Sequence, residues 1–321
     1  MHLLTAITSH GYGHASQVAP VLNRLSGAEP DLRLTLWSSL PESFLRERIT
    51  ADFTLLPVAP DFGLVMNSAL DINLTASAEA YAELHRDWDA QVQLVAQRLS
   101  RLAPDLVLAD VPYLTLAAAQ HAGINAVALC SLNWADIYRY YFSGRPEAQR
   151  ILEQMEAAYN SALAFLCPQP AMPMPFLDRR RDIGPLTSRG EPRMAELRDR
   201  LGIDDDKLLV MVSLGGVAAR LAMERWPEGQ GIHWLVNPDW QVQHADVGSL
   251  RQPGFSFADL LASCDAVLGK CGYGTVTECV ANGTPLLYVP RPDWPEDQTL
   301  VDWLDVHQAG IAVAPECLVS G

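Results

Sequence analysis

Short apolar runs of strand length alternate with amphipathic helical stretches along the whole chain. The alternation is typical of parallel sheets, because each parallel strand needs a crossover connection, usually a helix, before the next strand. Two sets of apolar residues follow helical spacing between the strand candidates: Val18, Val21, Leu22 and Leu25, and Val92, Leu94, Val95 and Leu99. The pattern predicts an α/β protein made of doubly wound, Rossmann-like parallel sheets.

The strand candidates form two groups on either side of a proline-dense stretch. The first group comprises residues 2–9, 32–38, 53–58, 105–110 and 125–130, and the second 207–213, 232–236, 265–269, 285–289 and 311–313. The stretch between them, residues 167–175, is interpreted as a stiff connector, because proline cannot donate ladder hydrogen bonds. A chain of 321 residues suits two domains, which we place at residues 1–179 and 180–321 with a cleft between them.

Charge and composition exclude several classes of function. The 38 acidic and 23 basic residues give a net charge of −15, which argues against nucleic-acid binding. No apolar run is long enough to span a membrane and the start of the chain lacks a basic leader, so a cytoplasmic protein is expected. The six cysteines lack the spacing of zinc or redox motifs. The chain ends soon after its last predicted strand, which indicates a truncated second domain.

The first predicted strand runs into a turn with two glycines, Gly11 and Gly13, before a helix. A dinucleotide-binding turn needs a third glycine, where this chain has Ser16, and a carboxylate at the end of the second strand, which is missing. The turn does place His14 at a helix amino terminus on the carboxyl edge of a sheet, where a neutral imidazole can act as a general base. A structural histidine that caps the turn explains this residue equally well.

Asp110 ends a predicted strand of the same domain, at the same edge of the sheet. Its carboxylate could hold one nitrogen of His14 and leave the other to accept a proton. For an isolated strand-end aspartate, however, capping of the following turn is the commoner role. The aromatic-rich run at residues 132–142 is interpreted as helix core rather than as a surface on which an acceptor stacks.

Two glycine-rich turns follow strands in the second half. The first comprises Ser213, Gly215 and Gly216, whose amides could approach a phosphate, although such turns are frequent. The stronger signal is residues 265–278, which predict a strand, a glycine turn and a short helix. This turn would bring amides and a helix dipole to a diphosphate, while Lys270 adds a charge and Glu278 accepts the ribose hydroxyls. The structural alternatives are a solvated strand end for Lys270 and a helix-dipole role for Glu278.

The two ends of the chain together resemble the GT-B glycosyltransferases, in particular the UDP-glycosyltransferases of secondary metabolism, the peptidoglycan N-acetylglucosaminyltransferase and the amino-terminal region of L-arabinokinase. The resemblance rests on His10-Gly11-Tyr12-Gly13-His14 and Gly269-Lys270-Cys271-Gly272-Tyr273-Gly274-Thr275-Val276-Thr277-Glu278, so it spans nearly the whole chain. It implies a GT-B fold and a nucleotide-sugar donor, with a UDP-sugar expected, and it implies no metal or other cofactor.

The resemblance also assigns roles to single residues. Glu278 takes the position that grips the ribose, and Asp297-Gln298 that of a pair which contacts donor-sugar hydroxyls. His14 maps onto the general base and Asp110 onto the acid that orients it. Together with the turns above, this gives a donor-binding set of Gly11, Gly13, Ser213, Gly215, Gly216, Lys270, Gly272, Tyr273, Gly274, Thr275, Glu278, Asp297 and Gln298.

The sequence departs from the family pattern in two places. Lys270-Cys271-Gly272 stands where the plant-type motif begins His-Gly-Gly, so the diphosphate contacts do not carry over residue by residue. The helix that closes the family's fold by crossing back to the first domain has no counterpart in the sequence.

Three functions fit these features. A metal-independent, inverting glycosyltransferase would use His14 to activate an acceptor hydroxyl. A nucleotide-sugar hydrolase would use His14 to activate water, as in the pseudaminic-acid pathway enzyme with its similar turn. A non-catalytic sugar-nucleotide sensor, or a domain that serves a fused kinase, needs no such base, and the presence of both His14 and Asp110 weighs against it.

Overall fold

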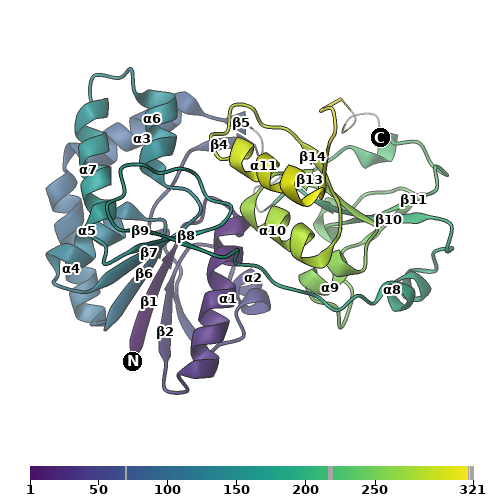
Figure 1. Cartoon of the computed structure of the whole chain (residues 1–321), viewed down its shortest axis with the longest axis horizontal. Helices are drawn as coiled ribbons and strands as arrows, with labels where there is room; N and C mark the ends of the chain where they lie inside the picture. Colours follow the sequence, from purple (N-terminus) through teal and green to yellow (C-terminus); the bar gives the residue numbers. More distant parts are fainter. Residues whose placement is uncertain (69–70, 216–219, 317, 319–321) are drawn as a thin grey trace. The chain divides into compact units, whose positions relative to one another are not determined.

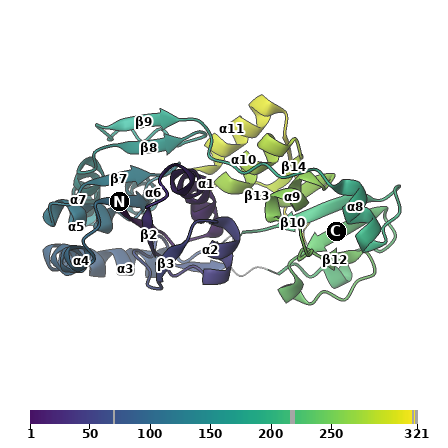
Figure 2. The same ribbon diagram turned by 90° about the horizontal axis from the view of Figure 1, so that it is seen from below.

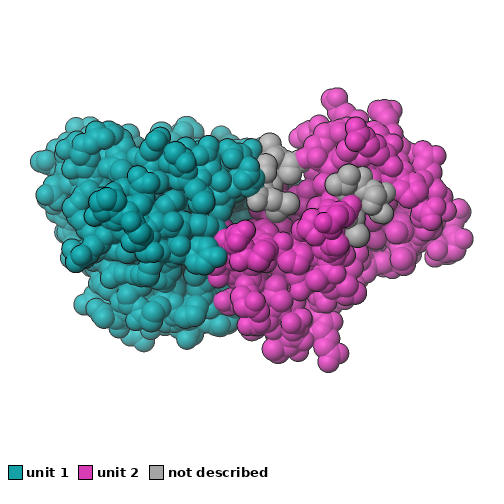
Figure 3. All heavy atoms as spheres, turned by 90° about the horizontal axis from the view of Figure 1, so that it is seen from above, with its two compact units in different colours: residues 1–186 teal, residues 187–321 magenta. Residues whose placement is uncertain are grey.

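A computed structural model of the chain describes residues 1–68, 71–215, 220–316 and 318. The chain divides into two compact units, Met1–Leu186 (unit 1) and Thr187–Gly321 (unit 2), which Figure 3 colours separately. Each unit is built on a parallel sheet, as the alternation of strands and helices predicts. The division falls after residue 186 rather than after residue 179, because the strand that begins at Arg180 belongs to the sheet of unit 1.

Unit 1 contains a seven-stranded sheet in the order β3-β2-β1-β6-β7-β8-β9, with parallel neighbours throughout (Figure 1). Its strands are β1 His2–Ile7, β2 Arg33–Trp37, β3 Phe53–Leu56, β6 Leu106–Asp110, β7 Ala126–Leu129, β8 Phe165–Pro168 and β9 Arg180–Ile183. A separate antiparallel pair is formed by β4 Met66–Ser68 and β5 Asp71–Ile72. Five of these seven sheet strands lie where the sequence predicts them.

Helices cover both faces of the unit 1 sheet (Figures 1 and 2). One face carries α1 Tyr12–Ala28 and α2 Glu42–Arg48, and the other α4 Trp88–Leu102, α5 Tyr113–His121 and α7 Ala148–Asn160. The remaining helices are α3 Leu74–Arg86 and α6 Trp134–Phe142. Val18 and Leu22, which set the predicted helical spacing of α1, are fully buried in one core cluster with Leu3 and Ile7 of β1.

The proline-dense stretch at residues 167–175 does not connect the units, which corrects the prediction. Its start lies in β8, and Pro168 ends that strand, where a missing amide costs little. Further along, Met172 and Met174 are buried, and the Met172 amide donates a hydrogen bond to the Ser131 carbonyl at 2.8 Å. The stretch therefore packs within unit 1 and leads to β9, a short charged strand at the edge of the sheet.

Unit 2 contains a six-stranded parallel sheet in the order β12-β11-β10-β13-β14-β15. Its strands are β10 Leu208–Ser213, β11 Ile232–Val236, β12 Val247–Ser249, β13 Ala266–Lys270, β14 Leu286–Val289 and β15 Gly310–Ala312. Its helices are α8 Met194–Leu201, α9 Phe257–Ala262, α10 Tyr273–Asn282 and α11 Asp297–His307, with short 3₁₀ turns η1 Met223–Arg225 and η2 Pro238–Trp240. Helix α10 packs between α9 and α11 (Figure 1).

Several smaller predictions can be compared with the described residues. The aromatic run at 132–142 forms α6, whose Trp134, Ile137 and Tyr138 are fully buried, as expected of helix core. Five cysteines are buried and outside any disulfide, while Cys317 lies outside the described residues. Most of the final residues, on which the prediction of a truncated domain rests, also lie outside them. Within the described ranges, no helix has the length and apolar character needed to cross a bilayer.

Candidate functional site

In unit 1 the strand order reverses between β1 and β6. Such switch points are where open α/β sheets bind ligands, because the connections after the two strands leave on opposite faces. Ile7 at the end of β1 is in register with Asp110 at the end of β6. His14 is the third residue of α1, which follows β1 directly and begins after the N-cap residue Gly11. The structure thus brings His14 and Asp110 to the same switch point.

The His14 and Asp110 side chains are in direct contact. Nδ1 of His14 lies 3.1 Å from Oδ1 of Asp110, and the two residues are 7% and 0% exposed. Burial raises the pKa of Asp110, whereas the charge of His14 and hydrogen bonds from His14 and Cys130 act in the opposite direction. With Nδ1 directed at the carboxylate, proton exchange with a ligand falls to Nε2 of the imidazole.

Cys130, just after β7, adds a thiol to this pair. Its Sγ lies 3.8 Å from Nδ1 of His14. One nitrogen, one carboxylate oxygen and one sulfur from His14, Asp110 and Cys130 lie within 4.8 Å of one another, an arrangement that could accommodate a cation. Because the imidazole and the carboxylate already form a hydrogen bond, we interpret the group as an acid–base pair with an adjacent thiol.

Sequence reasoning missed Asp61, which lies in the loop after β3. Thr8 Oγ1 donates a hydrogen bond to Asp61 Oδ1 at 2.5 Å, and Trp134 Nε1 donates to Oδ2 at 2.7 Å. Burial raises the pKa of Asp61 to about 6; the charge of His14 lowers it and that of Asp110 raises it. The one available signal was topological, since the loop after β3 opens at the same carboxyl edge as the loops after β1 and β6.

In unit 2 the strand order reverses between β10 and β13. Ser213 at the end of β10 is in register with Gly269, where an added Cβ would lie 2.4 Å from the Ser213 carbonyl oxygen. Gly215 has φ of +84°, and a Cβ there would lie 3.2 Å from Cε of Lys270. These two glycines let β10 and Lys270 approach each other closely. Gly216, also predicted in this turn, lies outside the described residues.

Helix α10 begins at this switch point. Its N-cap is Gly272, no side chain caps it, and its first turn holds no acidic residue. Of the predicted donor-binding residues on the helix, Tyr273, Gly274 and Glu278 are buried and Thr275 is partly buried. The first-turn amides point out of the amino terminus, where an anion would meet them and the positive end of the helix dipole.

Both α1 and α10 have glycine as the N-cap residue, although the surrounding fold leaves room for a side chain at that position. A Cβ at Gly11, Gly13 or Gly272 would meet no atom within 4 Å, and the N-cap backbones of Gly11 and Gly272 are extended, which any residue tolerates. By contrast, α3, α6 and α9 are capped by the side chains of Asn73, Asn133 and Ser256. The absence of a side chain at the two site helices leaves their amino termini open to a ligand.

Two cations lie near the α10 turn. Lys270 ends β13; burial, and then the charge of Arg291, lower its pKa to about 8. Arg291 follows β14 and was not predicted as a site residue. Its Nε and Nη2 donate to Oδ1 of Asp297 at 3.1 and 2.9 Å, and Nη2 also donates to the Cys271 carbonyl. Arg291 therefore ties the glycine turn to the start of α11.

Asp297 and Gln298, which are predicted to act as a pair, have different surroundings. Asp297 is buried, and its Oδ2 accepts a further hydrogen bond from the Arg291 amide at 2.8 Å. Gln298 is exposed, and its Nε2 donates to Asp302 at 2.7 Å. Asp297 is thus held by Arg291, while Gln298 lies at the surface of unit 2.

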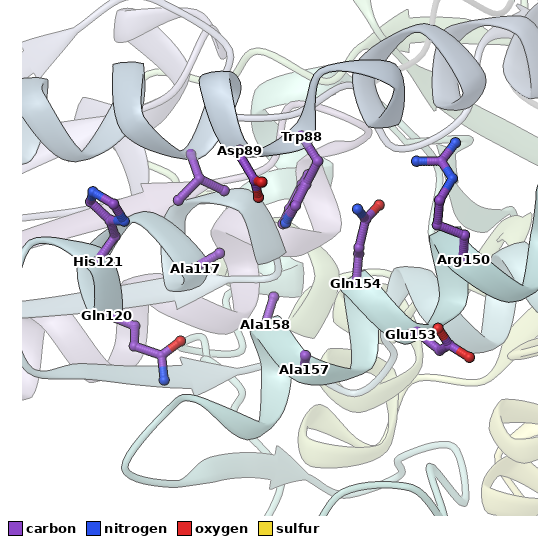
Figure 4. Close-up of a pocket in the computed structure, with 11 residues that line it drawn as sticks. Trp88, Asp89, Ala117, Gln120, His121, Arg150, Glu153, Gln154, Ala157 and Ala158 are labelled. Carbon is purple, nitrogen blue, oxygen red and sulfur yellow. The ribbon is translucent and has the colours of Figure 1, made fainter.

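A pocket of about 620 Å³ lies elsewhere in unit 1, between α4, α5 and α7 (Figure 4). Its lining includes Trp88, Asp89, His121 and Arg150, and none of the predicted site residues. Its lining contains both polar and apolar side chains, and it includes none of the glycines of the two turns. We assign candidate functional residues to the switch point of each unit rather than to this pocket.

The two sheets, each with a glycine-started helix at its switch point, define the protein as one with the GT-B fold. Solved glycosyltransferases share this architecture over nearly the whole chain. The glycotransferase of kitacinnamycin aligns with a TM-score of 0.61 at 15% identity, covering 98% of this chain and 86% of its own. The calicheamicin glycosyltransferase CalG4 aligns at 0.56 and 18%, covering 99% and 86%. UGT89C1 of Arabidopsis thaliana, solved with UDP, aligns at 0.56 and 16%, covering 98% and 85%.

Sequence relatives carry the same resemblance. L-arabinokinase of Arabidopsis thaliana is 27% identical over 100% of this chain, which spans only 31% of that relative's length. An uncharacterized glycosyltransferase of Methanopyrus kandleri is 23% identical over 91% of this chain and 86% of its own. A UDP-N-acetylglucosamine-dependent N-acetylglucosamine transferase of Corynebacterium glutamicum is 30% identical over 35% of this chain and 34% of its own. No protein-family model matches the chain. The predicted resemblance to GT-B glycosyltransferases is confirmed.

Proposed function

We propose that the protein is a glycosyltransferase that moves a sugar from a nucleoside-diphosphate sugar to an acceptor hydroxyl. The buried contact between His14 and Asp110 at the switch point of unit 1 carries this proposal. A UDP-sugar is the expected donor. In support, the solved UGT89C1 holds UDP, and the C. glutamicum relative uses UDP-N-acetylglucosamine.

In the proposed reaction His14 acts as general base. The acceptor hydroxyl donates a hydrogen bond to Nε2, which takes the proton as the acceptor oxygen forms a bond to the anomeric carbon. The bond from that carbon to the diphosphate breaks, and the diphosphate departs with the electron pair. Asp110 holds the Nδ1 proton and stabilises the imidazolium. Attack opposite to the leaving group inverts the anomeric centre.

Unit 2 supplies the donor site in this proposal. The amides of residues 272–275 and the dipole of α10 bind the diphosphate, and Lys270 adds a full charge. Glu278 accepts hydrogen bonds from the ribose, and Gln298 contacts the sugar. Because the helix terminus and Lys270 provide the positive potential that a metal supplies elsewhere, the reaction proceeds without one.

A second candidate is a sugar-nucleotide-binding domain without transferase activity. The observation that favours it is the match of the whole chain to under a third of L-arabinokinase, where this region is part of a larger protein. A hydrolase that uses His14 on water is the third candidate. All three share the donor site and differ in what happens to the donor.

One experiment separates these functions. A thermal-shift screen of nucleoside diphosphates and their sugars identifies the nucleotide, since a ligand at a hundred times its Kd adds about 2.7 kcal/mol to the free energy of unfolding. The best donor is then incubated with and without a panel of hydroxyl acceptors. Acceptor-dependent release of the nucleoside diphosphate is expected. Release without acceptor identifies a hydrolase, and binding without release identifies the non-catalytic domain.

A further inference from the structure

Asp61 is a carboxylate that the proposed reaction does not yet use. Its side chain is fixed from two sides, by the Thr8 hydroxyl at 2.5 Å and the Trp134 indole at 2.7 Å. The loop that carries it packs tightly, because a Cβ on the next-but-one residue, Gly63, would lie 2.7 Å from the Trp134 ring and 3.0 Å from His10. Gly63 also has φ of +61°, which favours glycine. The position of Asp61 is therefore set by the fold.

The same residues connect Asp61 to the acid–base pair. The backbone amide of Thr8 donates to the Asp110 carbonyl at 2.8 Å, so one residue contacts both aspartates. The Trp134 ring lies 6.2 Å from the His14 imidazole, centre to centre. Asp61 thus shares Thr8 with Asp110 and Trp134 with His14, and the charge of His14 acts on it.

Charge interactions act on both partners equally. The charge of His14 stabilises the ionised form of Asp61, and an ionised Asp61 must stabilise the protonated form of His14 to the same extent. Asp110 acts on Asp61 with the opposite sign. The charge of Asp61 also acts on three buried phenols, those of Tyr81 on α3, Tyr113 on α5 and Tyr159 on α7. Burial raises their pKa values well above the usual range, so they stay neutral.

We propose that Asp61 is a positioning residue for the proposed glycosyl transfer: its carboxylate stabilises the imidazolium that forms when His14 takes the acceptor proton. This inference rests on the proposed function of His14. It gives the site two carboxylates with different tasks. Asp110 orients the imidazole through Nδ1, and Asp61 contributes charge through space in a partly buried environment, where screening by water is weak.

Asp61→Asn tests the charge with little change in shape. The amide oxygen can accept from Trp134 Nε1, and the amide nitrogen can donate to Thr8, whose hydroxyl accepts as well as donates. Both contacts therefore persist while the negative charge is lost. We expect kcat to fall about tenfold, which corresponds to a change of about one unit in the pKa of His14, with donor affinity unchanged. The acid limb of the pH–rate profile should move to lower pH.

A second measurement does not depend on turnover. In ¹⁵N-labelled protein, the imidazole of His14 should titrate at lower pH in Asp61→Asn than in the natural protein. Should that variant not fold, the reciprocal experiment uses His14→Gln and follows the ¹³C signal of the Asp61 carboxyl group. Its titration should move to higher pH, because the neighbouring positive charge is gone.

Thr8→Val is the matched control, since it removes one hydrogen bond to Asp61 and keeps the carboxyl group. Because that hydrogen bond lowers the pKa of Asp61, the two variants are compared at a pH above 8, where the carboxyl group of Thr8→Val is ionised. If Asp61 only anchors the loop, Thr8→Val and Asp61→Asn will reduce kcat alike and neither will move the acid limb or the His14 titration, which overturns the proposal. If His14→Ala retains full turnover, the proposed function itself fails. If His14→Ala is inactive and Asp61→Asn is unaffected in rate and titration, only the role of Asp61 is refuted.

Discussion

Helices α1 and α10 are built alike and surrounded differently. Each follows a central strand at a switch point, starts after a glycine N-cap, and has neither a side-chain cap nor an acidic residue in its first turn. At α1 the first turn carries His14 against the buried Asp110. At α10 the neighbouring side chains are Lys270 and Arg291. In the proposed function, the same open helix terminus serves two chemistries, proton transfer at α1 and anion binding at α10.

The proposed function requires this acidic protein to bind an anion. The chain has a net charge of −15, which repels polyanions over long distances. At α10 the positive potential is local. It comes from backbone amides and from Lys270, whose pKa burial lowers to about 8. The comparison predicts that changes at α1 affect rate and changes at α10 affect affinity.

The largest expected effect is at α1. His14→Ala should lose about 10²–10⁴-fold in kcat, the usual contribution of a general base, while the Kd for nucleoside diphosphate stays near that of the natural protein. Turnover assays and calorimetry on the same preparation measure both quantities. A parallel loss of affinity would instead make His14 a ligand-binding residue and erase the contrast between the two helices.

Asp110→Asn should show the same pattern as His14→Ala. The double variant should be scarcely slower than His14→Ala alone, because a carboxylate that only orients an imidazole has nothing left to orient. Additive losses in the kinetic double-mutant cycle would show that Asp110 contributes independently of His14.

The next effect is at α10. Glu278→Gln should weaken nucleotide binding by about 1.5–3 kcal/mol, the cost of losing a hydrogen bond to a charged acceptor, with kcat at saturating donor little changed. Isothermal titration calorimetry measures the change, and circular dichroism checks the fold, since Glu278 is only 3% exposed. Equal affinity in a folded variant would leave Glu278 with a helix-dipole role alone.

Lys270 should make nucleotide affinity depend on pH. Its pKa is lowered to about 8, so the ammonium is present at pH 7 and is lost as the pH rises through that value. A bound diphosphate favours the ammonium, so the midpoint in the complex lies higher than in the free protein. We expect affinity to decline above pH 8. Lys270→Arg keeps its charge in this range and should remove the decline.

The smallest expected effect is that of a chelator. Nucleoside diphosphate should bind equally well with and without EDTA, because the α10 terminus and Lys270 supply the positive potential. Binding that requires magnesium or manganese would contradict the proposed donor site, because a metal ion would then supply the positive potential.

The central strands could be predicted from sequence because each is an apolar run with both faces covered. Strands β8, β9 and β12 could not. β8 ends in a proline, β9 is mostly charged, and β12 comprises only Val247–Ser249. Such short strands, of which β9 and β12 lie at sheet edges, depend on their neighbours in the sheet rather than on their own composition. The interpretation of residues 167–175 as a connector was wrong for the same reason.

The site shows a similar limit. His14 follows β1 and Asp110 ends β6, and the carboxyl ends of these neighbouring strands share one edge, so topology alone brings the two residues together. Asp61 and Arg291 lie in the loops after β3 and β14, and neither belongs to a motif whose local structure the sequence predicts. The resemblance did suggest Asp297 as a sugar ligand, but it could not reveal that Arg291 holds this residue. The catalytic and ligand roles of all these residues remain predictions.

The open amino termini of α1 and α10 have a consequence for protein engineering. Serine, asparagine or aspartate at position 11 or 272 would satisfy helix amides, fit the extended backbone and meet no steric obstacle. A selection for thermostability alone should therefore favour replacing both glycines. Each replacement would place an oxygen where the substrate is proposed to lie. Resistance to heat and turnover should consequently trade off at these two positions.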